Sequence, residues 1–129
     1  MTAKFSMEAI QELLDASSDD EVTLSFEVPN RIYGFHGQQA VEKLLKVLML
    51  LTGSNYEYTH DIEVLVQSVI NGGETVPGTP YPMTDLTDFG VLFRYTEPKT
   101  LTPTERNQIR ETVRILREHV HARLVVLGA

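Results

Sequence analysis

The segment Phe35–Leu51 carries an apolar stripe with the period of an α-helix, and it constrains the fold more than any other part of the chain. On a helix, its apolar side would hold Ala40, Val41, Leu44, Leu45, Leu48 and Leu51. Its polar side would hold Gln38, Gln39, Glu42, Lys43 and Lys46. Glu42 precedes Lys46 by four residues, which is the favourable order for an ion pair on a helix surface. The sequence therefore predicts a long amphipathic helix that starts at Ile32 or Gly34 and ends near Thr52.

Four further segments have helix signals. Ser6 can cap a first helix that runs to about Ala16, a third helix is expected over residues 59–71, and a short fourth one over residues 84–97. The clearest start is Thr102-Pro103-Thr104-Glu105, which combines a capping threonine, a proline at the first helical position and a glutamate three residues after the cap. These segments predict an all-α fold, an antiparallel up-and-down bundle of four to five helices in a single domain over residues 1–129.

The stretch Glu21–Asn30 does not fit this helical pattern. Four apolar residues alternate there with polar ones, namely Val22, Leu24, Phe26 and Val28, and Pro29 closes the stretch. Taken alone, this alternation predicts a β-strand. Because a helical bundle offers no partner strand, an extended loop or an edge that pairs with another chain are the other interpretations.

Composition excludes several classes of protein. The chain has no cysteine, which excludes disulfides, thiolate metal ligands and thiol catalysis. No apolar run is long enough to cross a bilayer, and the N-terminal residues form an acidic amphipathic segment rather than a signal peptide. We therefore expect a cytoplasmic protein with no membrane partner.

Charge is distributed unevenly along the chain. The formal net charge is −7, which disfavours a general nucleic-acid coat. Residues 1–98 carry 5 Lys and Arg against 15 Asp and Glu, whereas residues 99–129 carry 6 against 3. Two interpretations follow: the basic face of the last helix packs against acidic neighbours, or it forms a local anion or phosphate site in an otherwise acidic protein.

The last predicted helix contains the pattern best suited to catalysis. Arg114, Arg117 and His121 lie three and four residues apart, and seven residues return a helix to within roughly 20° of the starting direction. One face then presents two guanidinium groups, which bind phosphoryl charge, and an imidazole, which transfers a proton near neutral pH. In RNA cleavage the 2′-hydroxyl would be the nucleophile, without a metal. His119 points about 140° away from Arg114 and is the weaker geometric partner.

The same residues also have a structural interpretation, a solvated or dimer-facing basic stripe beside the apolar seam of the helix. Three further residues are candidates for binding together with Arg117, namely His60, Arg94 and Arg110. His60 opens the third predicted helix, where a structural hydrogen bond at the turn is the other interpretation. The chain has none of the common phosphate-loop, zinc-protease or serine-hydrolase motifs, and its four histidines lack the spacing of a metal site. We therefore expect neither a metal nor a cofactor.

Three further stretches stand out in the sequence: FHGQQAVEKLLK over residues 35–46, Thr59-His60-Asp61, and Phe93-Arg94-Tyr95. In this order and spacing they resemble the HEPN family of small helical domains. The resemblance implies an up-and-down helical bundle that commonly forms a homodimer. Many family members accompany a minimal nucleotidyltransferase, and such pairs act as toxin and antitoxin. Active members are metal-independent ribonucleases with an arginine, four to six other residues and then a histidine. Arg114 with His119, and Arg114 with His121, both satisfy that spacing, although Ile115 stands where active members usually have a polar residue.

Three hypotheses follow from the resemblance and the basic face. The first is a toxin-like ribonuclease whose dimer brings two Arg–His sets into one cleft. The second is a non-catalytic module that holds a nucleotide, RNA or a partner nucleotidyltransferase with Arg94, Arg110, Arg114 and nearby residues. The third is a purely structural helical dimer whose C-terminal arginines pair with acidic residues.

Overall fold

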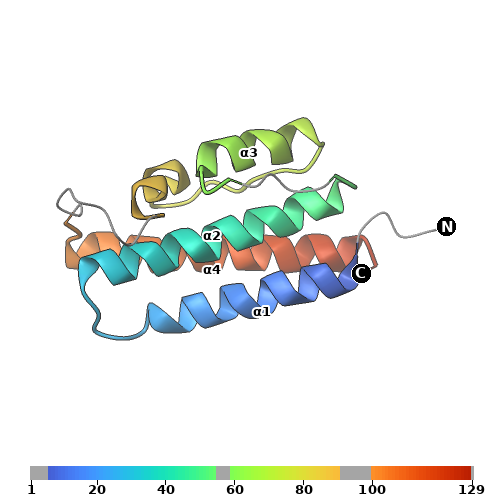
Figure 1. The fold of residues 1–129 in the computed structure, drawn as a ribbon. Helices are drawn as coiled ribbons and strands as arrows, with labels where there is room; N and C mark the ends of the chain where they lie inside the picture. Colours follow the sequence, from blue (N-terminus) through green and yellow to red (C-terminus); the bar gives the residue numbers. More distant parts are fainter. Residues whose placement is uncertain (1–5, 55–58, 91–99, 129) are drawn as a thin grey trace.

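The computed structural model describes residues 6–54, 59–90 and 100–128, which form a helical bundle (Figure 1). Its elements are α1 (Met7–Thr23), α2 (Asn30–Leu51), α3 (Ile62–Asn71), the 3-10 helix η1 (Met83–Phe89) and α4 (Pro103–Val126). The described residues contain no β-strand. The predicted all-α bundle is therefore confirmed. No helix within the described ranges combines the length and the apolar character that crossing a bilayer requires.

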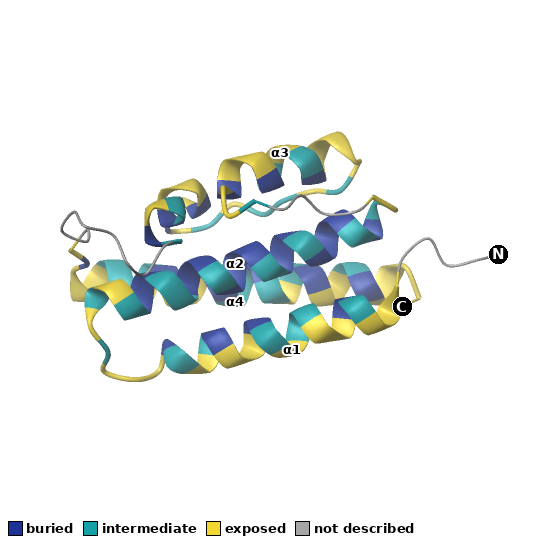
Figure 2. Cartoon of the chain, viewed as in Figure 1, coloured by how far each residue is buried: buried dark blue, intermediate teal, exposed yellow. Residues whose placement is uncertain are grey.

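Helix α2 is the centre of the bundle, because α1, α3, η1 and α4 all pack against it. Thirteen of its 22 residues are buried, and Figure 2 shows the buried sides of the other helices turned toward it. Burial extends to Gln38 and Glu42, which are 0% and 3% exposed. The expectation that Glu42 and Lys46 form a surface pair is therefore wrong for Glu42. The two residues do pair, with 3.0 Å between Nζ and Oε2, but they do so against the core.

The helices do not all alternate in direction. Helix α1 runs opposite to α2 and α4, whereas α2, α3 and α4 run the same way (Figure 1). The start of α4 lies at the start of α2, where the Tyr33 hydroxyl donates to the Arg106 carbonyl at 2.8 Å. After α3, the chain returns along α4, since Glu74 contacts Arg123 and Tyr81 contacts Thr112. A return segment of about ten residues can span a 22-residue helix, because an extended residue covers about twice the rise of a helical one.

The stretch Glu21–Asn30 is not a strand. Helix α1 continues to Thr23, beyond the predicted end near Ala16, and the residues after it connect α1 to α2. Ser17, Asp20 and Leu24 are buried at helical spacing, while Phe26 is 61% exposed. The alternation of apolar residues therefore does not describe which residues are buried. The inner face of α1 is partly polar here, and a pattern that counts only apolar residues does not detect it.

Two glycines of α2 allow its neighbours to approach closely. A Cβ on Gly34 would lie 2.2 Å from Cδ1 of Phe89 in η1, and a Cβ on Gly37 would lie 2.7 Å from Cγ2 of Ile109 in α4. Phe89 and Ile109 are both buried. The two glycines thus determine how closely η1 and α4 pack against α2.

Helix α4 begins as the sequence predicts. The Thr102 hydroxyl accepts from the Glu105 amide at 3.1 Å, and the Glu105 carboxylate accepts from the Thr102 amide at 3.0 Å, with Pro103 at the first helical position. The short fourth helix is present as η1, a 3-10 helix that begins at Met83. Its predicted continuation over residues 91–97 lies outside the described residues.

Candidate functional site

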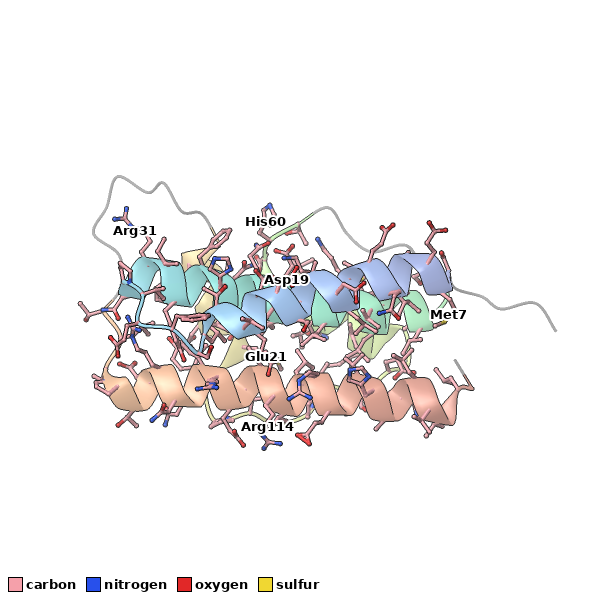
Figure 3. All side chains as sticks on the ribbon, turned by 90° about the horizontal axis from the view of Figure 1, so that it is seen from below. Met7, Asp19, Glu21, Arg31, His60 and Arg114 are labelled. Carbon is pink, nitrogen blue, oxygen red and sulfur yellow. The ribbon has the colours of Figure 1, made fainter. Side chains whose placement is uncertain are left out.

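A groove runs between α1 and α4 (Figure 3). It consists of three adjoining hollows of about 420, 430 and 250 Å³. Ser18 and Arg117 line both the first and the second hollow, and Ser25 and Arg110 line both the second and the third. The three hollows therefore adjoin one another, and we call them together the α1–α4 groove. Its floor includes Leu44 of α2.

Helix α4 contributes three arginines and a histidine to this groove: Arg106, Arg110, Arg117 and His121. Their spacings of four, seven and four residues keep them on one face of the helix. Helix α1 contributes two carboxylates, Asp15 and Glu21, to the same groove. The positive charge of the groove is therefore partly offset by the opposite wall.

The three arginines of the groove differ in what they contact. Arg106 is structural, because it donates to Asn30 Oδ1 and the Val28 carbonyl and stacks on a tyrosine ring at 4.6 Å. Arg117 donates from Nε to Glu21 Oε1 at 2.9 Å, and its terminal nitrogens have no partner among residues 6–54, 59–90 and 100–128. Arg110 has no hydrogen-bond or ion-pair partner within those ranges, and its side chain is exposed. Arg110 and Arg117 are thus the cations of the second hollow that can bind an added anion.

Arg114 does not line the groove. Figure 3 shows its side chain pointing away from α1. It forms ion pairs with Glu111 and Glu118 on the same helix. The hydrogen bonds and charge of Glu111, together with Glu118, raise the pKa of Arg114 above its ordinary value. Of the predicted set, Arg117 and His121 lie together in the first hollow, while Arg114 lies outside it, paired with carboxylates.

The remaining predicted residues are dispersed. His119 lies away from the groove, where its Nε2 is 2.8 Å from the carbonyl oxygen of Thr75 in the segment after α3. His60 lies before α3 and contacts α2. Arg94 and the Phe93-Arg94-Tyr95 stretch lie outside the described residues. The structure therefore brings Arg110, Arg117 and His121 to one groove and does not bring His119 or His60 there.

A polar network surrounds Glu42, and the sequence predicted its pairing with Lys46 but not its contacts with Gln38 and His60. Its Oε1 accepts from Nε2 of Gln38 at 2.9 Å and from Nδ1 of His60 at 2.8 Å, and its Oε2 accepts from Lys46 at 3.0 Å. Gln38 also donates to the carbonyl of His60 at 3.1 Å. Burial acts to raise the pKa of Glu42, but the donors Gln38, His60 and Lys46 together hold it below the ordinary value of 4.5. This network joins α2 to the start of α3.

A second buried carboxylate joins α1 to α2. Asp20 is 6% exposed, and its two oxygens lie 2.7 Å from His36 Nδ1 and 2.5 Å from Lys43 Nζ. The polar side chains of α2 are therefore largely used in holding neighbouring helices. Within the described ranges, no three His, Asp or Glu side chains come together as metal ligands.

The contribution of Glu42 to stability is expected to depend on pH. Because its pKa is lower in the folded chain than in the unfolded one, its contribution is present above about pH 4.5 and is lost as the pH falls through the folded-state pKa. The measurement is urea unfolding of the wild type and of Glu42→Gln between pH 7 and pH 3. The difference in urea midpoint between the wild type and Glu42→Gln should become smaller as the pH falls. A constant difference would contradict this assignment.

The comparisons with known proteins agree with the fold. A model of the HEPN domain family matches residues 21–123, which is most of the chain. The chain belongs to the HEPN family. No curated protein and no solved structure was found to match it.

Two stretches that make the sequence resemble other HEPN domains meet in this structure. Gln38 and Glu42 belong to the stretch FHGQQAVEKLLK, and His60 belongs to Thr59-His60-Asp61. The contacts of Glu42 and Gln38 with His60 connect them. In this HEPN domain the two stretches therefore stabilise the packing of α3 on α2, at a site separate from the α1–α4 groove.

Proposed function

We propose that this HEPN-domain protein is a binding module that holds the phosphates of a nucleotide or RNA in the α1–α4 groove. One observation carries the proposal: Arg110 and Arg117 line the same hollow, and both have guanidinium nitrogens without a partner among the described residues. A guanidinium group binds phosphate in a bidentate manner and stays charged at any physiological pH.

The second hollow has the size and chemistry for such a ligand. Its volume of about 430 Å³ falls in the usual range for small-molecule sites, roughly 300–1,000 Å³. Ser18 and Ser25 add hydroxyl groups to its lining. His121 follows Arg117 by one helical turn and extends the polar lining into the first hollow. The excess of negative charge elsewhere in the chain favours a local phosphate site over broad electrostatic attachment to nucleic acid.

Binding is tested with a fluorescein-labelled oligouridylate and with ATP, measured by anisotropy and by calorimetry respectively. Arg110→Ala and Arg117→Ala should each weaken binding about tenfold, the effect of losing one charge-assisted contact. Each should also reduce the slope of log affinity against log salt by about one. Arg31→Ala is the matched control, because Arg31 is an exposed arginine that lines none of the three hollows (Figure 3). Equal losses of affinity in Arg110→Ala, Arg117→Ala and Arg31→Ala would contradict the proposal, as would a wild type that does not bind.

A ribonuclease of toxin–antitoxin type is the second candidate function. It is favoured by Arg117 and His121, which place a guanidinium and an imidazole in one hollow. The imidazole can transfer a proton while the 2′-hydroxyl of the RNA attacks the phosphorus, and no metal is required. In the family, dimers bring two such sets together, and the partner is often a minimal nucleotidyltransferase. For this chain, the dimer and that partner are proposals that rest on the family alone.

Cleavage of labelled RNA in the presence of a chelator tests the second candidate. We expect His121→Ala and Arg117→Ala to abolish cleavage and His119→Ala to preserve it, because His119 lies outside the groove. Arg114→Ala distinguishes the family spacing from the observed groove: a loss there would indicate that Arg114 turns toward the RNA on binding. Cleavage that survives all four substitutions would exclude this site.

A further inference from the structure

We propose that Glu21 is an internal competitor for the ligand phosphate, so that its carboxylate occupies Arg117 until a phosphate displaces it. This inference rests on the proposed function of the α1–α4 groove. Glu21 Oε1 lies 2.9 Å from Arg117 Nε, and the two side chains come from opposite walls of the groove. Figure 3 shows Glu21 directed from α1 toward α4. A carboxylate and a phosphate bind a guanidinium group through the same kind of charge-assisted hydrogen bond.

The position of Glu21 explains why its carboxylate is available for such an exchange. It lies in the last turn of α1, where the helix dipole disfavours negative charge and where the helix has no basic residue of its own. Asp20, its neighbour, is buried and contacts two side chains of α2, His36 and Lys43. Glu21 is only partly buried, with 23% of its side chain exposed, and its one ion-pair partner among the described residues is Arg117. A single contact of this kind contributes little to stability, so a phosphate can replace it at small cost.

The two arginines of the second hollow are therefore in different states. Arg110 is open, whereas Arg117 is partly covered by Glu21. They lie two helical turns apart, roughly 10.5 Å along the axis of α4. A ligand phosphate can bind Arg110 directly, but it reaches Arg117 only when the carboxylate moves away. If the carboxylate stays in the hollow, it repels the bound phosphate.

The test is the effect of Glu21→Gln on binding of the labelled oligouridylate and of ATP. We expect both ligands to bind about three- to tenfold more tightly, because the amide keeps the shape of the side chain and removes its charge. Glu111→Gln is the matched control: it removes the same charge from α4, but from the ion pair with Arg114 outside the groove. The affinity of Glu111→Gln for each ligand should stay within twofold of that of the wild type. Circular dichroism and thermal unfolding check that each variant is folded.

A third variant distinguishes displacement from a general effect of charge. In an Arg117→Ala background, Glu21→Gln should increase the affinity for the ligand much less than it does in the wild type. No guanidinium covered by Glu21 remains there to be released. An equal gain in both backgrounds, or an equal gain from Glu111→Gln, would overturn the inference. A wild type that binds through Arg110 and Arg117 but is not improved by Glu21→Gln would overturn the inference and leave the proposed function standing. Absence of binding by the wild type would contradict the proposed function, and it would also overturn the inference that rests on that function.

Discussion

Replacing Glu42 with alanine is expected to lower the free energy of unfolding by about 3–5 kcal/mol, the usual cost of breaking a buried ion pair by removing one partner. Glu42 is 3% exposed and accepts three hydrogen bonds, two of them from Gln38 and His60. Alanine leaves the buried amide of Gln38 with one acceptor fewer and opens a cavity beside the core. The substitution also removes a direct contact between α2 and His60, which lies just before α3.

The measurement is equilibrium unfolding in urea at pH 7, followed by circular dichroism. Glu118→Ala is the matched control, because Glu118 also forms an ion pair within one helix, with Arg114, but its side chain is 54% exposed. The midpoint of the control should stay close to that of the wild type, since exposed pairs contribute little. Equal shifts for the two variants would show that the Glu42 network is no more important than a surface ion pair.

Replacing Gly34 with alanine is expected to destabilise the protein by about 1–3 kcal/mol, the usual cost of overpacking a core. On an exposed helix the same change would stabilise by up to about 1 kcal/mol. Here the new Cβ would lie 2.2 Å from Cδ1 and 2.4 Å from Cγ of Phe89. Cγ is the first ring atom, so the whole ring would have to move, and Phe89 is 4% exposed. The overlap therefore outweighs the gain in helix propensity.

Two controls isolate the overlap with Phe89. Gly78→Ala should be neutral or slightly stabilising, because a Cβ at Gly78 would have no atom within 4 Å. In a Phe89→Ala background, Gly34→Ala should no longer destabilise, since the ring that it overlaps is absent. The interpretation fails if Gly34→Ala costs the same free energy with and without the Phe89 ring.

Local signals in the sequence predicted much of the fold. The capping box at Thr102 and Glu105 involves residues three apart, so it located the start of α4 without any knowledge of the tertiary structure. The apolar stripe of α2 likewise indicated its length to within a few residues. That Arg117 and His121 lie on the same face of α4 also follows from helix geometry alone, because they are four residues apart.

Contacts between helices were not predictable in the same way. Glu42 and Gln38 are polar, so a single sequence assigned them to the surface, and only the neighbours on all sides of α2 bury them. The predicted end of α1 near Ala16 was too early for the same reason, because Ser17 and Asp20 are polar but buried. The environment of Arg114 was not predicted either, because its side chain forms ion pairs with Glu111 and Glu118 on its own helix rather than lining the groove.

The sequence by itself determined that the chain is helical, where its last helix begins, and that its basic residues gather on that helix, because caps and periodicity act over a few residues. Only the tertiary structure decided that α1 faces α4 across a groove, that Glu21 reaches Arg117, and that the polar side of α2 is buried. These outcomes depend on residues far apart in the chain, and their energies arise from burial and charge pairing that exist only once the helices are packed.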